Sequence, residues 1–225
     1  MVRIGMVRIL GLLSAALILS ACVSSRSGSP RDYYLNFAFQ PPKPNEVTVC
    51  HGYGCRIKTP FQVNSDDIQR FQTIMSEFDG SAEEELQGVQ KVVSYMEQRV
   101  GKVLGTDKDR AKIETSGIND PTQQDCIDEA TNTTSYLLVL ESHGLLKYHN
   151  VRRPEVRGYW VDGKWPHWTA VLQNQDNQEE WAVDTWFRDN GVPPVVIPLK
   201  DWYKYDEDRG EPNMPYPGPP ETQSA

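Results

Sequence analysis

The chain lacks an excess of basic residues. Its 225 residues include 23 Lys and Arg against 31 Asp and Glu, which gives a formal net charge of −8. An acidic protein repels phosphate groups, so this charge balance argues against binding to nucleic acid or to anionic lipid surfaces. The chain also lacks internal repeats, and its 38% of apolar residues is enough for one ordinary core, so we expect a single domain.

No apolar run long enough for a comfortable membrane span occurs near the N-terminus. The stretch at residues 9–19 is short, follows a small basic segment and ends in small residues, which predicts a cleaved export signal at residues 1–21. The run Leu-Ser-Ala-Cys22 resembles the lipobox of bacterial lipoproteins. This resemblance implies that Cys22 is acylated and becomes the mature N-terminus. Because Val23 follows it rather than aspartate, we expect an outer-membrane anchor facing the periplasm, with a simple secreted protein as the alternative.

Cysteine is scarce, with four in the chain. With Cys22 lipidated, three remain, and paired cysteines oxidise in an exported protein. Cys50 and Cys55 flank a turn-like His-Gly-Tyr-Gly segment, which predicts a hairpin closed by a disulfide. A metal site built from both sulfurs and His51 is an alternative that lacks a fourth ligand, and no metal or other cofactor is expected. Cys126 is then the odd thiol.

Composition divides the chain into four parts. After the signal, residues 22–45 are rich in Ser, Pro and Asn and predict a flexible tether. Residues 46–205 form the predicted domain, and the Pro-rich residues 206–225 form a tail.

Helical periodicity precedes β periodicity within the domain. Capping residues and apolar spacing predict helices that begin at Ser65 and Ser81 and a third from about 124 to 143. Alternating strands are predicted at 157–161, 167–173 and 179–184, joined by short turns into an antiparallel meander. Helices followed by strands predict an α+β fold in which the third helix packs on the sheet.

The third helix begins with a candidate nucleophile. Cys126 stands where the helix dipole lowers the pKa of a thiol and where backbone N–H groups can hold an oxyanion. Gln123 or Gln124 is a candidate side-chain donor to that oxyanion.

A base and a carboxylate follow the cysteine along the chain. His167 and Asp184 lie on neighbouring predicted strands, where cross-strand pairing can place them side by side. A base held by a carboxylate is the general arrangement of a catalytic triad. Trp168, next to the histidine, is the candidate wall of a substrate groove.

Each candidate also has a simpler interpretation. Cys126 fits a small buried apolar residue, and His167 fits a strand histidine packed between Trp165 and Trp168. Asp184 fits a turn residue at the end of a strand, and Asp189 is its rival. The remaining histidines, in loops or at a helix end, are expected at the surface or as caps.

In this order the residues resemble the transglutaminase-like superfamily, nearest to the bacterial transglutaminase-like cysteine peptidases. The similarity covers about residues 120–190. It implies a papain/transglutaminase-like core with Cys126 as nucleophile, His167 as general base and acid, and Asp184 orienting the imidazole. The implied activity is attack on protein or peptide amides through an acyl-thioester, which water or an amine resolves. The only membrane contact expected is the N-terminal lipid.

Departures from the family keep other interpretations open. In some bacterial relatives, acidic residues beside the cysteine are tied to calcium; here Ile127 follows it, and only Asp125, Asp128 and Glu129 remain for that role. An NlpC/P60-like peptidoglycan amidase also starts a helix with Asp-Cys, but lacks the Ile-Asp that follows here. A non-catalytic envelope lipoprotein that uses the fold as an interaction module is the third alternative.

Overall fold

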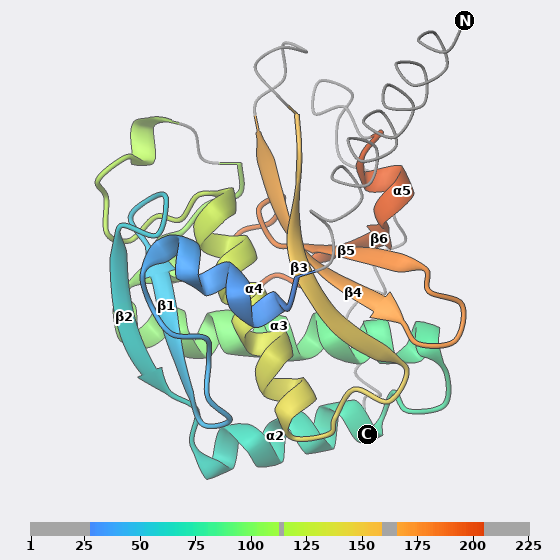
Figure 1. Ribbon diagram of the computed structural model, residues 1–225. Coiled ribbons are helices and arrows are strands. Elements are labelled where there is room, and N and C mark those ends of the chain that lie inside the picture. Colours follow the sequence, from blue (N-terminus) through green and yellow to red (C-terminus); the bar gives the residue numbers. More distant parts are fainter. Residues whose placement is uncertain (1–27, 113–114, 159–165, 205–225) are drawn as a thin grey trace, which may run out of the picture.

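The computed structural model describes residues 28–112, 115–158 and 166–204. The fold is α+β, with a two-stranded and a four-stranded antiparallel sheet and helices between and around them (Figure 1). The predicted signal peptide, the candidate lipidation site Cys22 and the tail at 206–225 lie outside the described residues. Within the described ranges, no helix has the length and apolar character that crossing a membrane requires.

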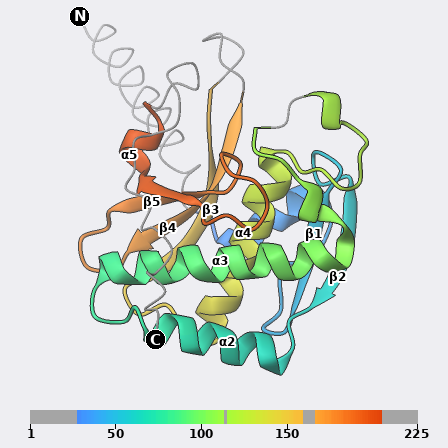
Figure 2. The ribbon, with the colours of Figure 1, turned by 180° about the vertical axis from the view of Figure 1, so that it is seen from behind.

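Helix α4 (Cys126–Ser142) occupies the centre of the molecule. The small sheet lies on one side of it, the large sheet on the other, and α3 behind it (Figures 1 and 2). Every residue from Asp128 to Leu140 is buried, so the polar residues of this stretch need internal partners. Asn132 provides an example: its side chain bonds both the N–H and the carbonyl of Cys50, at 2.7 and 2.8 Å. The periodicity of the sequence predicts a helix with one face in the core, whereas α4 is buried on all sides.

Helices α2 (Ser65–Ser76) and α3 (Ala82–Leu104) confirm the two N-terminal helices. Ser81 caps α3 by accepting the N–H of Glu84 at 3.1 Å, whereas α2 is capped by Asn64, one residue before the serine expected there. The apolar stripe of α3 packs towards α4 in the main core, so these two helices complete that core. Its buried residues are Leu86, Val89, Val92, Val93, Met96 and Val100.

The large sheet has the order β3–β4–β5–β6, with every pair antiparallel. Its strands are β3 (His149–Arg157), β4 (His167–Asn174), β5 (Glu180–Asp184) and β6 (Val195–Pro198). The meander of β4 and β5 confirms the prediction. The strand expected at 157–161 instead begins at His149, and residues 159–165 lie outside the described part. Strand β6 and the short helix α5 (Leu199–Trp202) were not predicted.

The small sheet is the hairpin of β1 (Glu46–His51) and β2 (Ile57–Gln62). A disulfide joins Cys50 to Cys55 across its loop, with their Cα atoms 4.5 Å apart. The hairpin packs on α4 near the start of that helix. Two segments far apart in the sequence therefore meet where the candidate nucleophile stands.

The predicted tether at 22–45 is wrong for part of its length. Residues Pro30–Phe37 form a 3-10 helix, η2, in which Tyr33 and Tyr34 are fully buried. Their hydroxyls bond Thr131 at 3.1 Å and Ser135 at 2.8 Å, both on α4. The abundance of Ser, Pro and Asn predicts a flexible segment, but two tyrosines within it bind the segment to α4. The folded body therefore begins before residue 46.

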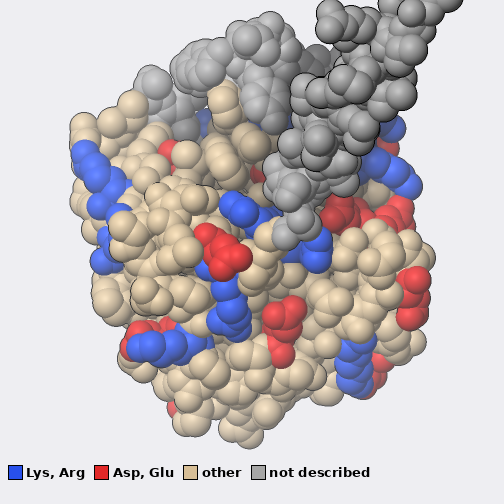
Figure 3. Space-filling view, viewed as in Figure 1, with Lys and Arg blue, Asp and Glu red and all other residues tan. Residues whose placement is uncertain are grey.

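The charges of the described surface are mixed. On the face seen in Figure 3, Lys and Arg side chains are interspersed with Asp and Glu and form no large area of one sign. Exposed pairs such as Lys200 and Glu179, 2.7 Å apart, contribute to this pattern. On this face the acidic side chains are therefore dispersed rather than gathered at one site.

Candidate active site

Cys126 is the first residue of α4. The Asp125 side chain caps the helix by accepting the N–H groups of Ile127 at 3.1 Å and Asp128 at 2.9 Å. The thiol is half-buried, and its sulfur lies 3.9 Å from the carbonyl oxygen of Pro166. The cysteine thus combines a helix N-terminus, which favours thiolate, with a position beside the residue that precedes His167.

His167 and Asp184 form a buried pair. Nε2 of the histidine lies 2.7 Å from Oδ2 of the aspartate, and both side chains are almost completely buried. Ala170 pairs with Val183 across the two strands, so the two-residue alternation of strands brings the histidine and the aspartate to the same face. Nδ1 of His167 is also buried and has no hydrogen-bond partner among the described residues. The thiol is therefore close to the start of β4 but is not hydrogen-bonded to this nitrogen.

Aromatic rings surround the His167 imidazole. Its ring centroid lies 4.8 Å from that of Trp186, 5.3 Å from Phe187 and 5.7 Å from Trp202. Trp202 also donates its indole N–H to Oδ2 of Asp184 at 2.7 Å. Sequence reasoning missed Trp202, because no motif connects a tryptophan at the end of the domain with a triad.

The loop at 52–56, between β1 and β2, holds the first turn of α4. The backbone N–H groups of Tyr53 and Cys55 bond the Asp128 carboxylate at 2.7 and 2.6 Å, and that of Gly54 bonds Asp125 at 2.9 Å. Residues 52 to 55 all have positive φ, including Tyr53 at 74° and Cys55 at 57°, which non-glycine residues rarely adopt. This conformation turns successive N–H groups towards the carboxylates, as in an anion-binding nest.

The residues of the possible metal site at the hairpin have other partners. The sulfurs of Cys50 and Cys55 are bonded to each other, and both ring nitrogens of His51 are engaged, with Pro121 at 2.7 Å and Thr59 at 2.9 Å. His51 is also buried, contrary to the surface position expected for it.

The carboxylates discussed for calcium serve the backbone instead. Asp125 and Asp128 accept the N–H groups of the loop and of the helix start, whereas Glu129 faces a cavity elsewhere. Burial, and then the charge of Asp125, raise the pKa of Asp128 to about 8, although the three N–H groups act in the opposite direction. These residues do not fit a calcium site.

The remaining sequence candidates have structural partners. The side-chain amide of Gln123 donates to the carbonyl of Lys108 at 2.8 Å, and that of Gln124 to the carbonyl of Cys50 at 3.0 Å. Trp168 packs against Tyr33, with ring centroids 6.0 Å apart, and not against His167. Asp189 is exposed and accepts the N–H of Ala111 at 2.8 Å. Of the two rival aspartates, only Asp184 contacts the histidine.

A cluster of three acids lies behind the thiol. Loss of contact with water raises the pKa of Glu97 to about 8 and that of Asp109 to about 7. Burial, followed by the charges of the other two acids, raises the pKa of Glu129 well above its ordinary value. Glu129 is one turn from Cys126, and its Oε2 has no hydrogen-bond partner among the described residues. The raised pKa values of the three acids therefore reduce the negative charge of this cluster at neutral pH.

No protein-family model, no curated protein and no solved structure matches this chain. The grounds for a function are therefore the geometry of the site and the resemblance of its residues to the transglutaminase-like superfamily.

Proposed function

We propose that the protein is a cysteine-dependent hydrolase or acyltransferase that acts on protein or peptide amides. The observation that carries this proposal is the buried bond between His167 and Asp184, beside a thiol at the first residue of a helix. That arrangement supplies a nucleophile, a base and a group that orients the base. The papain/transglutaminase-like core implied by the resemblance belongs to the same proposal.

The proposed reaction begins with proton transfer from the Cys126 thiol to Nδ1 of His167. The sulfur attacks the amide carbonyl carbon, and the electron pair of the C=O bond moves to the oxygen. When the tetrahedral adduct collapses, the C–N bond breaks and the imidazolium gives its proton to the leaving amine. The acyl-thioester is then attacked by water or by a second amine, with His167 accepting the proton of that nucleophile. The reaction releases an acid or a new amide and restores the thiol.

The proposed oxyanion donor is the backbone N–H of Cys126, at the N-terminus of α4. The side-chain amides of Gln123 and Gln124 already donate to carbonyl groups, so they brace the loop that leads into the helix.

We also propose export and lipid anchoring through Cys22. The disulfide between Cys50 and Cys55 supports export, because disulfides persist in oxidising compartments. The test is fractionation of bacterial cells that express the full chain. We expect the protein in the outer-membrane fraction and the Cys22→Ser variant elsewhere; an unchanged membrane fraction for that variant would reject the lipid anchor.

The acyl-thioester is the species that tests the proposed activity. We expect intact-protein mass spectrometry, after brief exposure to a blocked amino-acid p-nitrophenyl ester, to detect one acyl group on the wild type and none on Cys126→Ala. In His167→Ala the acyl group should form more slowly and persist for longer. Acylation that is unaffected by either change would overturn the proposal.

Peptidoglycan fragments and amine acceptors provide the second stage of this experiment. Release of peptide from the fragments, lost on Cys126→Ala, favours the peptidoglycan amidase over action on proteins. Transfer of the acyl group to an added amine assigns transamidation, and release of free acid assigns hydrolysis. No acylation at all favours the non-catalytic lipoprotein.

A further inference from the structure

Trp202 contacts both members of the His167 and Asp184 pair. Its indole N–H donates to the same carboxylate oxygen, Oδ2 of Asp184, that faces Nε2 of the histidine, and both distances are 2.7 Å. Its ring lies tilted at 35° to the imidazole, with centroids 5.7 Å apart. Trp202 itself has no exposed surface. Trp202 therefore holds the Asp184 carboxylate through a hydrogen bond and restricts the orientation of the His167 ring through packing.

Arg157 holds Trp202 in turn. The guanidinium group lies 4.8 Å from the centroid of the indole ring, and its Nη1 donates to the carbonyl oxygen of Trp202 at 3.2 Å. Arg157 is the last residue of β3, and β3 pairs with β4, the strand that carries His167. The tryptophan is thus held by the same sheet that carries the residues it contacts.

The shared oxygen has a consequence for the histidine. An indole N–H is only a donor, and a donated hydrogen bond stabilises negative charge on the oxygen that accepts it. An ionised carboxylate can only accept, so Nε2 of His167 must carry the proton of the neutral ring. Nδ1 is then left with a lone pair, which is the form that a base towards Cys126 requires.

We propose that Trp202 is a positioning residue that holds His167 in the tautomer protonated at Nε2. The inference rests on the proposed function, because a fixed tautomer matters for a base. It goes beyond that function by giving a role to a residue outside the triad. Trp202 acts through Asp184 and contacts neither the thiol nor, in this proposal, the substrate.

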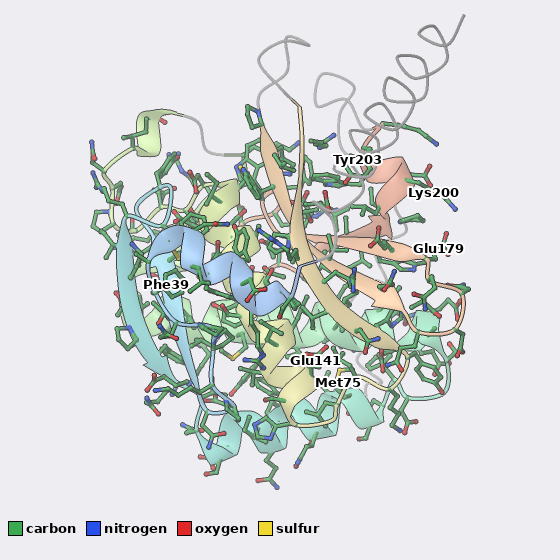
Figure 4. All side chains as sticks on the ribbon, viewed as in Figure 1. Phe39, Met75, Glu141, Glu179, Lys200 and Tyr203 are labelled. Carbon is green, nitrogen blue, oxygen red and sulfur yellow. A yellow bond between two sulfur atoms is a disulfide. The ribbon has the colours of Figure 1, made fainter. Side chains whose placement is uncertain are left out.

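The test compares Trp202→Phe, which removes the indole N–H and keeps an aromatic ring, with Tyr203→Phe. Tyr203 is the next residue along (Figure 4), and its hydroxyl donates to Glu155 at 2.7 Å, so this control removes one hydrogen bond that does not involve Asp184. The first readout is the ¹⁵N chemical shifts of the His167 ring, measured in a Cys126→Ala background. The second is the pH dependence of Cys126 alkylation by iodoacetamide, measured with the thiol present.

We expect Trp202→Phe to bring the two ring-nitrogen shifts closer together and to slow alkylation at neutral pH by about tenfold, while Tyr203→Phe changes neither. Wild-type shifts and rates in Trp202→Phe would overturn the proposal. Should Trp202→Phe not fold, benzothienylalanine at this position replaces only the N–H by sulfur and gives the same comparison. The tautomer measurement does not need a reactive thiol, so failure of the proposed function appears separately, as alkylation that does not depend on His167.

Discussion

The two halves of the proposed site are held by different kinds of contact. The cysteine half consists of the start of α4 and the loop at 52–56. The backbone N–H groups of this loop bond the carboxylates of Asp125 and Asp128, and a disulfide closes it. The histidine half, which consists of β4, β5 and α5, is held by side chains: Nε2 of His167 and the indole of Trp202 converge on Asp184. Apart from a change of the thiol itself, a single side-chain change should therefore affect chemistry in the histidine half, and mainly stability in the cysteine half.

The largest expected effect is in the histidine half. We expect Asp184→Asn to lower the rate of acylation by roughly a thousandfold, because an amide in this place no longer enforces the reactive tautomer. Asp189→Asn is the matched control, since that aspartate is exposed and its side chain accepts the N–H of Ala111. Pre-steady-state acylation rates measure both. Equal losses of acylation rate in the two variants would show that Asp184 has no specific role in the reaction.

In the cysteine half, Asp128→Ala should lower the free energy of unfolding by roughly 2–4 kcal/mol, because three backbone N–H groups lose their acceptor. Urea unfolding followed by fluorescence measures this change. Asp66→Ala removes an exposed acid from the first turn of α2 and should change stability by less than about 0.5 kcal/mol. A small effect of Asp128→Ala would mean that the loop does not depend on these bonds.

Opening the disulfide should have a smaller effect. We expect the Cys50→Ser/Cys55→Ser double variant to lose about 2 kcal/mol of stability, because the short closed loop no longer restricts the unfolded chain. Alkylation of Cys126 should also slow, since the loop positions the first turn of α4. Reduction with dithiothreitol should reproduce both changes in the wild type and add nothing in the double variant; an additional effect there would contradict this explanation.

The acids behind the thiol should give the smallest effect. Folding raises the pKa of Glu97 to about 8 and that of Asp109 to about 7, so the folded protein keeps protons that the unfolded chain releases from about pH 4 upwards. The free energy of unfolding should therefore fall as pH rises through this range towards about 8. Glu97→Gln should make that fall shallower, because the amide binds no proton in either state. Glu83→Gln, at an exposed position on the same helix, should leave the pH dependence of stability unchanged. Thermal unfolding across the pH range measures both variants.

Much of the fold was predictable because its pattern is local. Apolar spacing and caps mark α2, α3 and α4, and alternation marks β4 and β5. Strand β3 is harder to recognise because it contains charged residues, Pro154 and a register shift between Arg152 and Glu155. Strand β6 has only four residues and follows two prolines.

The site was predictable only where its residues lie in a motif. Cys126 stands at the start of a helix, and His167 and Asp184 stand on neighbouring strands. Local sequence patterns predict each of these positions. Trp202 lies on α5, and the buried acids come together from α3, α4 and a long loop, so only the tertiary packing shows them. Gln123, Gln124 and Trp168 are near the site in sequence, but their side chains have partners elsewhere.

The rate of Cys126 alkylation by iodoacetamide as a function of pH tests the central claim most directly. We expect the wild type to react well below the pH at which a free thiol, with a pKa of about 8.5, becomes reactive, and His167→Ala to react only near that pH. Identical profiles for the two proteins, both centred near the free-thiol value, would contradict an activated cysteine.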